Sequence, residues 1–349
     1  MAYTTINKSS DYFNTKLYTG NGSAGNAITG VGFQPDWTWI KNRDAAYWHQ
    51  TFDAVRGASA GALYTNETSA EDYGGGNLLA SFDSDGFTVN TNAGCNANGQ
   101  NLVAWNWKAN SAGSSNTAGT INSTVSVNTT SGFSIVTYTG NGTGGATVGH
   151  GLGVAPSMII EKGRSVTDDW LIYHKSIGAT KGLALNNTTA EAASSGYWND
   201  TAPTSSLFTI GNNGKVNTNG GTHVAYCFAE KAGYSKFGSY TGTGDADGTF
   251  VYTGFKPAFI LQKRTNSAST GWGIIDNTRS PFNVSQNMLL ANSTAVEDTS
   301  SAPAVDFLSN GFKWRTADGW FNGGGDPHIF MAFAEAPLVG SNNVPCTAR

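Results

Sequence analysis

Tyr18-Thr-Gly-Asn-Gly22 occurs almost unchanged at two later places in the chain, as Tyr138-Thr-Gly-Asn-Gly142 and Tyr240-Thr-Gly-Thr-Gly244. The copies begin 120 and 102 residues apart. Solenoid repeats recur every ~20–50 residues, so a period this long leaves room for a small domain in each copy. The chain is therefore predicted to hold three versions of one module, and a site that occurs in only one version needs its own explanation.

The similarity between the copies extends well beyond this opening. In each copy a proline introduces a short apolar segment, which is followed by an Asn-x-Thr-x-x-Glu motif and a closing apolar segment. The first segments lie at 32–43, 153–164 and 254–264, the motifs at 66–71, 186–191 and 292–297, and the closing segments at 103–107, 224–230 and 329–335. A tryptophan at 48, 170 and 272 is also taken as shared. We expect domains at residues 1–110, 111–232 and 233–349.

The stretch Asn110–Thr130 is poor in apolar residues and rich in Ser, Thr, Asn and Gly, which predicts a linker before the second copy. Its later half, from Thr120, also resembles the start of the first copy. That half is alternatively the first strand of the second copy. The junction Lys231–Phe237 is short, so the second and third copies are expected to pack closely.

The composition favours an all-β protein. Charged residues make up 13% of the chain, about half the usual ~25%. Glycine accounts for 45 of 349 residues and aromatic residues for 12%, which suits short strands, tight turns and rings packed between sheets. The predicted fold is three tandem β-sandwich domains of a jelly-roll or lectin-like kind.

Strand patterns are frequent and helical patterns are scarce. Turn pairs such as Asp85-Gly86 and Asn310-Gly311 separate the strand candidates. Short helical turns are expected only around 69–73, 190–193 and 295–298. Strands are expected at 37–41, 86–90, 102–108, 134–138, 158–161, 170–174, 206–210, 223–228, 258–263, 312–315 and 328–334.

The charge pattern argues against several partners. The formal net charge is −4 and there is no basic stripe, so nucleic acid is not an expected partner. No apolar run approaches the ~20 residues that cross a membrane, and no signal peptide is recognised at the start, so we expect synthesis in a cytoplasm and no membrane insertion. The three cysteines are far apart and are expected to be free thiols.

Some acidic residues are candidates for catalytic or calcium-binding groups. Asp83-Ser-Asp85-Gly86 resembles part of a calcium loop, but its counterparts lack paired acids, so a turn is the preferred interpretation. A glycosidase pair could draw on Glu71, Asp72, Glu297 and Asp298. However, Thr-x-x-Glu is also the spacing of a helix capping box, which is the structural interpretation of these motifs. No catalytic residue, metal site or cofactor is expected.

Two copies share an Asp-x-x-Arg element. It consists of Asp53 with Arg56 in the first copy and Asp276 with Arg279 in the third, while His174 takes the acid's place in the second. Ion pairs that fix a loop explain the element most simply, and a ligand-binding role is the alternative. The five histidines do not show metal-ligand spacing.

The tryptophans have two interpretations. Those that alternate along predicted strands share one face and are expected in the core: Trp37, Trp39, Trp105 and Trp107. Others have no counterpart in the remaining copies and are candidates for stacking on sugar rings at a loop edge: Trp198, Trp314 and Trp320.

Several motifs together resemble an uncharacterised tandem repeat in tail-fibre-like virion proteins of tailed bacteriophages, especially marine ones. The resemblance covers most of the chain and is weakest in the second copy. It implies a structural or host-recognition component of a virion, which forms a homo-oligomer, but it supplies no catalytic residues. The motifs that carry it are Gly32–Arg43, Asp53–Gly57, Ser81–Val89, Val103–Ala109 and Phe330–Pro337.

Three hypotheses follow for the function. The first is a non-enzymatic tail fibre or appendage that contacts other virion proteins and a host-surface glycan. The second is a capsid decoration or head-fibre protein, and the third and most remote is a glycan depolymerase. A trimer is expected by analogy with fibre proteins, although the sequence contains no coiled-coil heptads.

Overall fold

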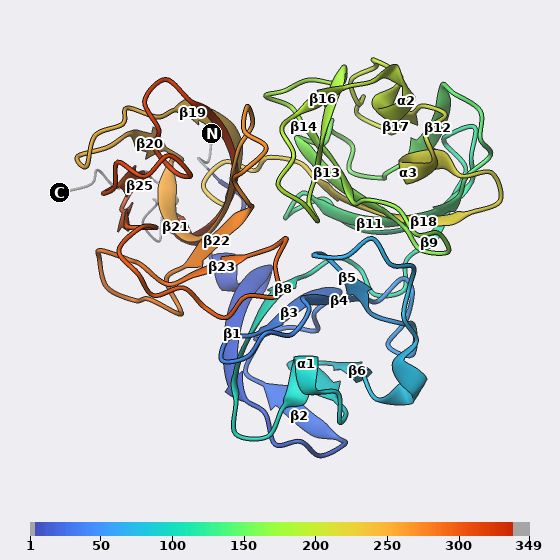
Figure 1. Cartoon of the computed structure of the whole chain (residues 1–349). Coiled ribbons are helices and arrows are strands. Elements are labelled where there is room, and N and C mark those ends of the chain that lie inside the picture. Colours follow the sequence, from blue (N-terminus) through green and yellow to red (C-terminus); the bar gives the residue numbers. More distant parts are fainter. Residues whose placement is uncertain (1–3, 338–349) are drawn as a thin grey trace.

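The computed structural model describes residues 4–337, which form an all-β protein with a few very short helices (Figure 1). The strands fall into three consecutive groups, called the first (β1–β8), second (β9–β18) and third (β19–β26) repeats below. Each repeat contains one larger and one smaller antiparallel sheet. None of the helices in this part of the chain is long and apolar enough to span a membrane.

The first repeat has a five-stranded sheet in the order β1-β8-β3-β4-β5 and a three-stranded sheet in the order β2-β7-β6. Its elements are η1 (Ser9–Asp11), β1 (Phe13–Thr19), β2 (Asn26–Thr29), β3 (Trp37–Asn42), β4 (Gln50–Asp53), β5 (Leu63–Tyr64), η2 (Gly74–Gly76), β6 (Leu79–Asp83), β7 (Gly86–Val89), α1 (Ala93–Asn96) and β8 (Asn101–Trp107). The calcium-like stretch is the tight turn between β6 and β7, as the turn interpretation predicted. Asp85 accepts hydrogen bonds there from the backbone N–H groups of Gly30 and Gly32.

The second repeat has an eight-stranded sheet, β16-β15-β14-β13-β18-β11-β10-β9, and the two-stranded sheet β12-β17. Its elements are β9 (Ser114–Asn116), β10 (Ser123–Asn128), β11 (Phe133–Thr139), β12 (Ala146–Gly149), β13 (Met158–Gly163), β14 (Leu171–His174), β15 (Lys181–Ala184), β16 (Ala192–Ala193), α2 (Ser195–Trp198), β17 (Leu207–Ile210), α3 (Gly214–Asn217) and β18 (Thr222–Phe228). Part of the expected linker therefore belongs to this sheet, because β9 and β10 lie within it. Its side-chain composition concealed the edge strand β9 and its neighbour β10, where few apolar residues are needed.

The third repeat returns to the pattern of the first, with the sheets β19-β26-β21-β22-β23 and β20-β25-β24. Its strands are β19 (Ser235–Thr241), β20 (Phe250–Tyr252), β21 (Phe255–Arg264), β22 (Gly273–Asp276), β23 (Met288–Leu290), β24 (Val305–Leu308), β25 (Gly311–Trp314) and β26 (Pro327–Pro337). The strand order of the first and third large sheets occurs inside the eight-stranded sheet as β11-β18-β13-β14-β15. The sequence triplication is thus also a triplication of strand topology.

Each large sheet buries its inner face against the small sheet of its own repeat. In the first repeat, Phe87 and Val89 of β7 share a buried cluster with Ile40 of β3 and Leu102 of β8. The other two repeats contain corresponding clusters. Since β3 is buried at every position, its outer face must also be covered.

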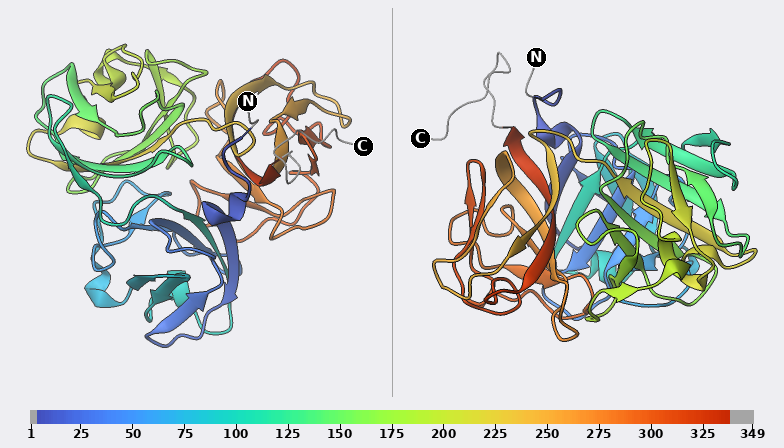
Figure 2. Two further views of the ribbon diagram at one scale, coloured as in Figure 1. Left: turned by 180° about the vertical axis from the view of Figure 1, so that it is seen from behind. Right: turned by 90° about the horizontal axis from the view of Figure 1, so that it is seen from above.

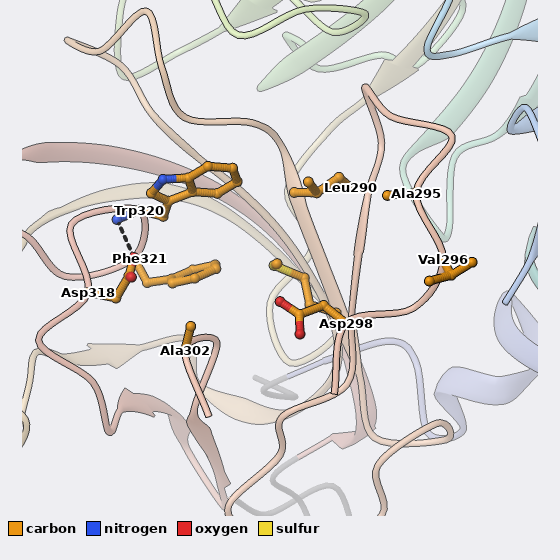
Figure 3. A pocket seen from close by; sticks show the side chains of 9 residues that line it. Leu290, Ala295, Val296, Asp298, Ala302, Asp318, Trp320 and Phe321 are labelled. Atoms are coloured by element: carbon orange, nitrogen blue, oxygen red, sulfur yellow. Dashed lines mark hydrogen bonds between the residues drawn. The ribbon is translucent and has the colours of Figure 1, made fainter. Parts of the chain in front are cut away.

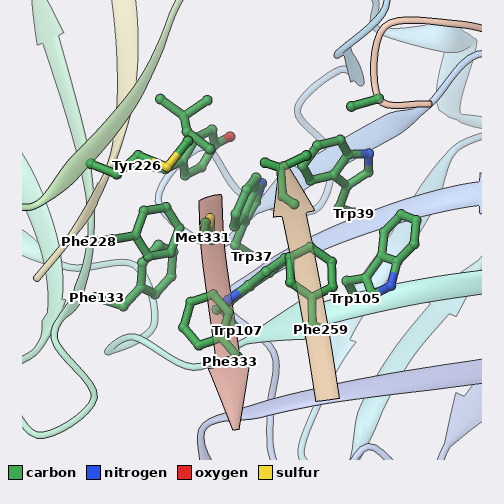
Figure 4. Packing of buried hydrophobic residues seen from close by; sticks show 14 of the residues in the cluster. Trp37, Trp39, Trp105, Trp107, Phe133, Tyr226, Phe228, Phe259, Met331 and Phe333 are labelled. Atoms are coloured by element: carbon green, nitrogen blue, oxygen red, sulfur yellow. The ribbon is translucent and has the colours of Figure 1, made fainter. Parts of the chain in front are cut away.

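The outer faces of the three large sheets pack against one another around a common centre (Figures 1 and 2). This central core contains side chains from all three repeats, including the four strand tryptophans that were expected to be buried (Figure 4). At its middle lie Trp107, Phe228 and Phe333, which occupy the same position on β8, β18 and β26. Their ring centroids are 5.8–6.4 Å apart in all three pairs. The chain therefore has a pseudo-threefold axis, and one polypeptide supplies all three subunits of the arrangement.

We expect Trp107→Ala to destabilise the whole molecule, because it opens a cavity where the three repeats meet. The loss should be about 3–5 kcal/mol, as for other large aromatic truncations in a core. Urea unfolding followed by circular dichroism measures it. Tyr252→Ala is the control, since that ring is 59% exposed, and its effect should stay within about 0.5 kcal/mol. Equal effects of the two substitutions would contradict a central role for the Trp107 ring.

Candidate functional site

The most regular polar contacts of the protein join one repeat to the next. The first apolar strand of each repeat, β3, β13 or β21, carries a fully buried lysine whose ammonium group donates to a backbone carbonyl of a neighbouring repeat. The pairs are Lys41 with Thr294 at 3.1 Å, Lys162 with Thr68 at 2.8 Å and Lys263 with Thr188 at 3.1 Å. They link the first repeat to the third, the second to the first and the third to the second, which closes a ring. Burial lowers the pKa of each lysine to about 8.

The Asn-x-Thr-x-x-Glu motif belongs to these interfaces. In every repeat the backbone N–H of its glutamate donates to a backbone carbonyl of the next repeat, at 2.7–2.9 Å: Glu71 to Arg164, Glu191 to Thr265 and Glu297 to Arg43. The Glu71 side chain also bridges Arg56 and Arg164, and the Glu297 side chain bridges Arg279 and Arg43. No helix begins at the motif's threonines, so the capping-box prediction was wrong, and so were the helical turns expected beside them. Glu71 and Glu297 instead make ion pairs between repeats, whereas the Glu191 side chain pairs with Lys181 of its own repeat.

The two Asp-x-x-Arg elements form buried ion pairs. Asp53 lies 2.5 Å from Arg56 and Asp276 lies 2.6 Å from Arg279, and all four side chains are fully buried. Each aspartate accepts a further hydrogen bond from another repeat: the Tyr226 hydroxyl donates to Asp53 at 2.8 Å, and the Trp105 indole donates to Asp276 at 2.9 Å. These groups bind each other across an interface and leave no carboxylate open to a substrate.

In the second repeat His174 replaces the acid, and the residue that it faces in the third repeat also differs. The position held by Trp105 and Tyr226 is occupied by Met331 in the third repeat, and methionine has no N–H or O–H to donate. His174 instead makes a 3.2 Å hydrogen bond to the Phe330 carbonyl through Nε2. Burial lowers the pKa of His174 to about 4, so the ring is neutral at pH 7 and donates. An acid here would have been a buried charge without a side-chain donor from the third repeat.

The structure shifts the alignment of one tryptophan by a residue. Trp170 and Trp272 directly precede β14 and β22, and their indole N–H groups donate at 2.8 Å to backbone carbonyls of the preceding repeat. His49, not Trp48, stands directly before β4. Trp48 is displaced from the interface and its side chain is 46% exposed. The expected equivalence of Trp48 with Trp170 and Trp272 was therefore wrong.

The three tryptophans proposed to stack on sugars have different environments. Trp198 and Trp314 are 1% and 0% exposed and lie in the inner cores of the second and third repeats. This corrects the expectation for both, because a buried ring offers no face to a ligand. Trp320 is only partly buried and lines a pocket (Figure 3).

A pocket lies at the same place in each repeat, beside the last strands of the large sheet. One wall begins at an Asn or Asp. Its side-chain oxygen accepts a hydrogen bond from the backbone N–H of the residue two positions further along the chain. These pairs are Asn92 with Gly94, Asn213 with Lys215 and Asp318 with Trp320, at 2.7–3.0 Å. The opposite wall is the end of the short strand β5, β15 or β23. The shared scaffold therefore presents three sites whose side chains differ.

The second and third pockets have contrasting linings. In the second pocket, of about 190 Å³, Lys215 and Asp169 form a 2.5 Å ion pair beside Tyr197. The third pocket, of about 270 Å³, is mainly apolar, with Trp320 and Phe321 facing Leu290 and Val296 (Figure 3).

The first pocket is larger, at about 450 Å³. Tyr47 and Trp48 line it with 37% and 46% exposure, and the Trp48 ring lies 4.8 Å from that of Tyr64. The Tyr64 hydroxyl donates to Asp72. Burial, and then the bond to this carboxylate, raise the pKa of Tyr64, so the hydroxyl remains protonated. Sequence reasoning missed this site because Trp48 had been aligned with buried tryptophans.

The part of the chain that the structure describes contains no cluster of potential metal ligands. Among residues 4–337 no group of three or more His, Cys, Asp or Glu side chains is placed to hold an ion. Cys95 and Cys227 are buried and unpaired, and burial raises the pKa of the Cys95 thiol to about 12. Cys346 lies outside the described residues.

Comparison with known proteins places the chain in a family. Residues 8–337 match the family described as a domain of unknown function, DUF7483, and the chain belongs to it. No curated protein and no solved structure matches the chain.

We expect Lys162→Met to weaken the contact between the first and second repeats. It removes the ammonium donor from the carbonyls of Thr68 and Asp168, of which the Thr68 carbonyl keeps the backbone N–H of Asp168, and hydrogen bonds to a charged group contribute about 1.5–3 kcal/mol. The loss is measurable as a lower urea midpoint. Lys256→Met is the matched control, because that lysine is 44% exposed and such surface pairs contribute about 0–1 kcal/mol. If Lys162→Met had the same urea midpoint as the wild type, the buried lysine would not stabilise the contact between these repeats.

We expect acid to destabilise the fold between pH 6.5 and 4. Burial lowers the pKa of His174 and His328 to about 4 from an ordinary 6.5, so the unfolded chain binds more protons in this window. Their stabilising contribution is present above pH 6.5 and disappears as the pH falls toward 4. His174→Asn keeps a donor and an acceptor but does not titrate, so its urea midpoint should fall less between pH 7 and 4.5. Identical falls in both proteins would show that His174 does not contribute.

Proposed function

We propose that this member of the DUF7483 family is a non-enzymatic structural protein of a bacteriophage virion. Its role would be that of a tail-fibre or appendage component that attaches to host-surface glycan. Each repeat would be a β-sandwich unit of the jelly-roll or lectin-like kind, formed by its large and small sheets.

One observation carries the proposal: the shared charged residues hold the repeats together, whereas the surface pockets differ from repeat to repeat. The buried lysines, the Asp-x-x-Arg elements and the motif glutamates Glu71 and Glu297 are all engaged in contacts that hold the repeats together. The pockets keep one scaffold but differ in lining. A rigid scaffold that carries variable surface sites is suited to recognition.

The virion assignment draws its support from the sequence motifs rather than from the pockets. The segments Gly32–Arg43 and Val103–Ala109 resemble tail-fibre-like repeats, and both are now located in the strands of the central core. A homo-oligomer of this chain would have to form through other surfaces, because the outer faces of all three large sheets already meet inside one molecule.

Quantitative mass spectrometry of purified particles tests this proposal. We expect the protein to co-purify with particles at a copy number far below that of the major capsid protein. A copy number close to that of the capsid protein would favour the decoration alternative, and absence from particles would refute a virion role. Release of reducing ends from host polysaccharide would instead support the depolymerase alternative.

A further inference from the structure

We propose that the first pocket is a binding subsite for a neutral hexopyranose, and that the equivalent pockets of the second and third repeats are not. This inference rests on the proposed attachment role and specifies its ligand and its location.

The aromatic groups of the first pocket are arranged for contact with a ligand. Trp48 and Tyr47 are adjacent in sequence, both are more than one-third exposed, and both line the same hollow. Exposing two large rings costs favourable burial, and an aromatic wall with a few polar groups is typical of a small-ligand site. A hexopyranose matches this wall because one face of its ring presents mainly C–H groups, which pack on an aromatic face.

Polar groups for the sugar hydroxyls border the same rings. The Asp72 carboxylate is held by Tyr64 and by the backbone N–H of Gly74, and it accepts further hydrogen bonds readily. Asn92 uses its oxygen for Gly94 and Gln50, and its amide nitrogen donates to none of the described residues. Gln50 is 3% exposed, and its oxygen has no hydrogen-bond partner among the described residues. Buried polar groups without a partner are uncommon and call for an explanation.

The electrostatics select a neutral sugar. No lysine or arginine is among the residues that line the first pocket, while Asp72 contributes a negative charge. An anionic sugar would meet this carboxylate without a compensating cation, which is unfavourable near the surface. A neutral ring with hydroxyl groups avoids that repulsion and can donate to Asp72.

The equivalent pockets lack this combination. The position of Trp48 is held by Asp169 in the second repeat and by Gly271 in the third, and the position of Gly94 is held by Lys215 and Trp320. Lys215 occupies the second pocket through its ion pair with Asp169. The second and third pockets, at about 190 and 270 Å³, also fall below the ~300–1,000 Å³ usual for ligand sites, whereas the first reaches about 450 Å³.

The test is direct binding of methyl hexopyranosides to the full chain, measured by saturation-transfer NMR and calorimetry. The probes are methyl glucoside, galactoside and mannoside, with glucuronate as the anionic comparison. We expect millimolar binding of at least one neutral glycoside and weaker binding of glucuronate. Trp48→Ala should raise the dissociation constant about tenfold or more. Because Trp48 lies at the surface, a circular dichroism melt should confirm that this variant is folded.

Two matched variants locate the effect. Tyr252→Ala removes an exposed ring outside the first pocket, and Trp320→Ala removes the ring of the equivalent third pocket, so both should bind like the wild type. Absence of neutral-sugar binding, tighter binding of glucuronate, or equal losses in all three variants would overturn the inference. Particle composition is measured separately, so a protein found in virions that binds no hexopyranoside would refute this subsite alone. Sugar binding by a protein absent from virions would refute only the virion role.

Discussion

Burial of both faces of each large sheet is the constraint on which the structure depends. The inner face packs on the small sheet of the same repeat, and the outer face packs on the other two repeats around Trp107, Phe228 and Phe333. An isolated repeat would expose its outer face to water, which in the first repeat includes paired tryptophans. Large exposed apolar patches favour association, and here the partners are supplied by the same chain.

Apolar contact alone would not fix how the three sheets are rotated against one another. The directional contacts do so: the buried lysines donate to carbonyls of the neighbouring repeat, and the motif glutamates pair with its backbone. Buried charges are costly unless they are paired, so a rotated arrangement would be disfavoured because these groups would lose their partners in the neighbouring repeat. The interface between the second and third repeats follows the same requirement with different residues. There Met331 has no group to donate, and His174 replaces the acid.

Much of this architecture could be predicted from the sequence because repeats reveal themselves by self-comparison. The strands, the buried strand tryptophans and the all-β character follow from alternation and composition. The role of the shared motifs could not be predicted in the same way. Thr68 to Glu71 has the spacing of a helix cap, and only the neighbouring repeat, distant in sequence, supplies Arg164 and Lys162 to use it differently. Long-range partners leave no local signature.

The candidate site was missed for a related reason. Alignment by residue type matched Trp48 with Trp170, whereas strand register matches Trp170 with His49. A one-residue offset moves a side chain from a buried position to an exposed one, so Trp48 was treated as a shared scaffold residue and not as a candidate for ligand binding. Trp198 and Trp314 were assigned to the surface because they lacked counterparts, yet a ring can be unique to one repeat simply by filling space in that repeat's own core.

A threefold body made from one chain differs physically from a homotrimer in one respect. In a homotrimer every substitution appears three times, so each pocket must have the same lining. Here positions 48, 169 and 271 can carry tryptophan, aspartate and glycine on one scaffold. The contacts that close the ring must still be complementary in pairs, which limits change there to coupled replacements such as His174 with Met331. The pockets carry no such constraint because each is formed mainly by its own repeat. Substitutions in the pockets therefore disturb the fold least, and the side chains of the three repeats differ in chemistry there.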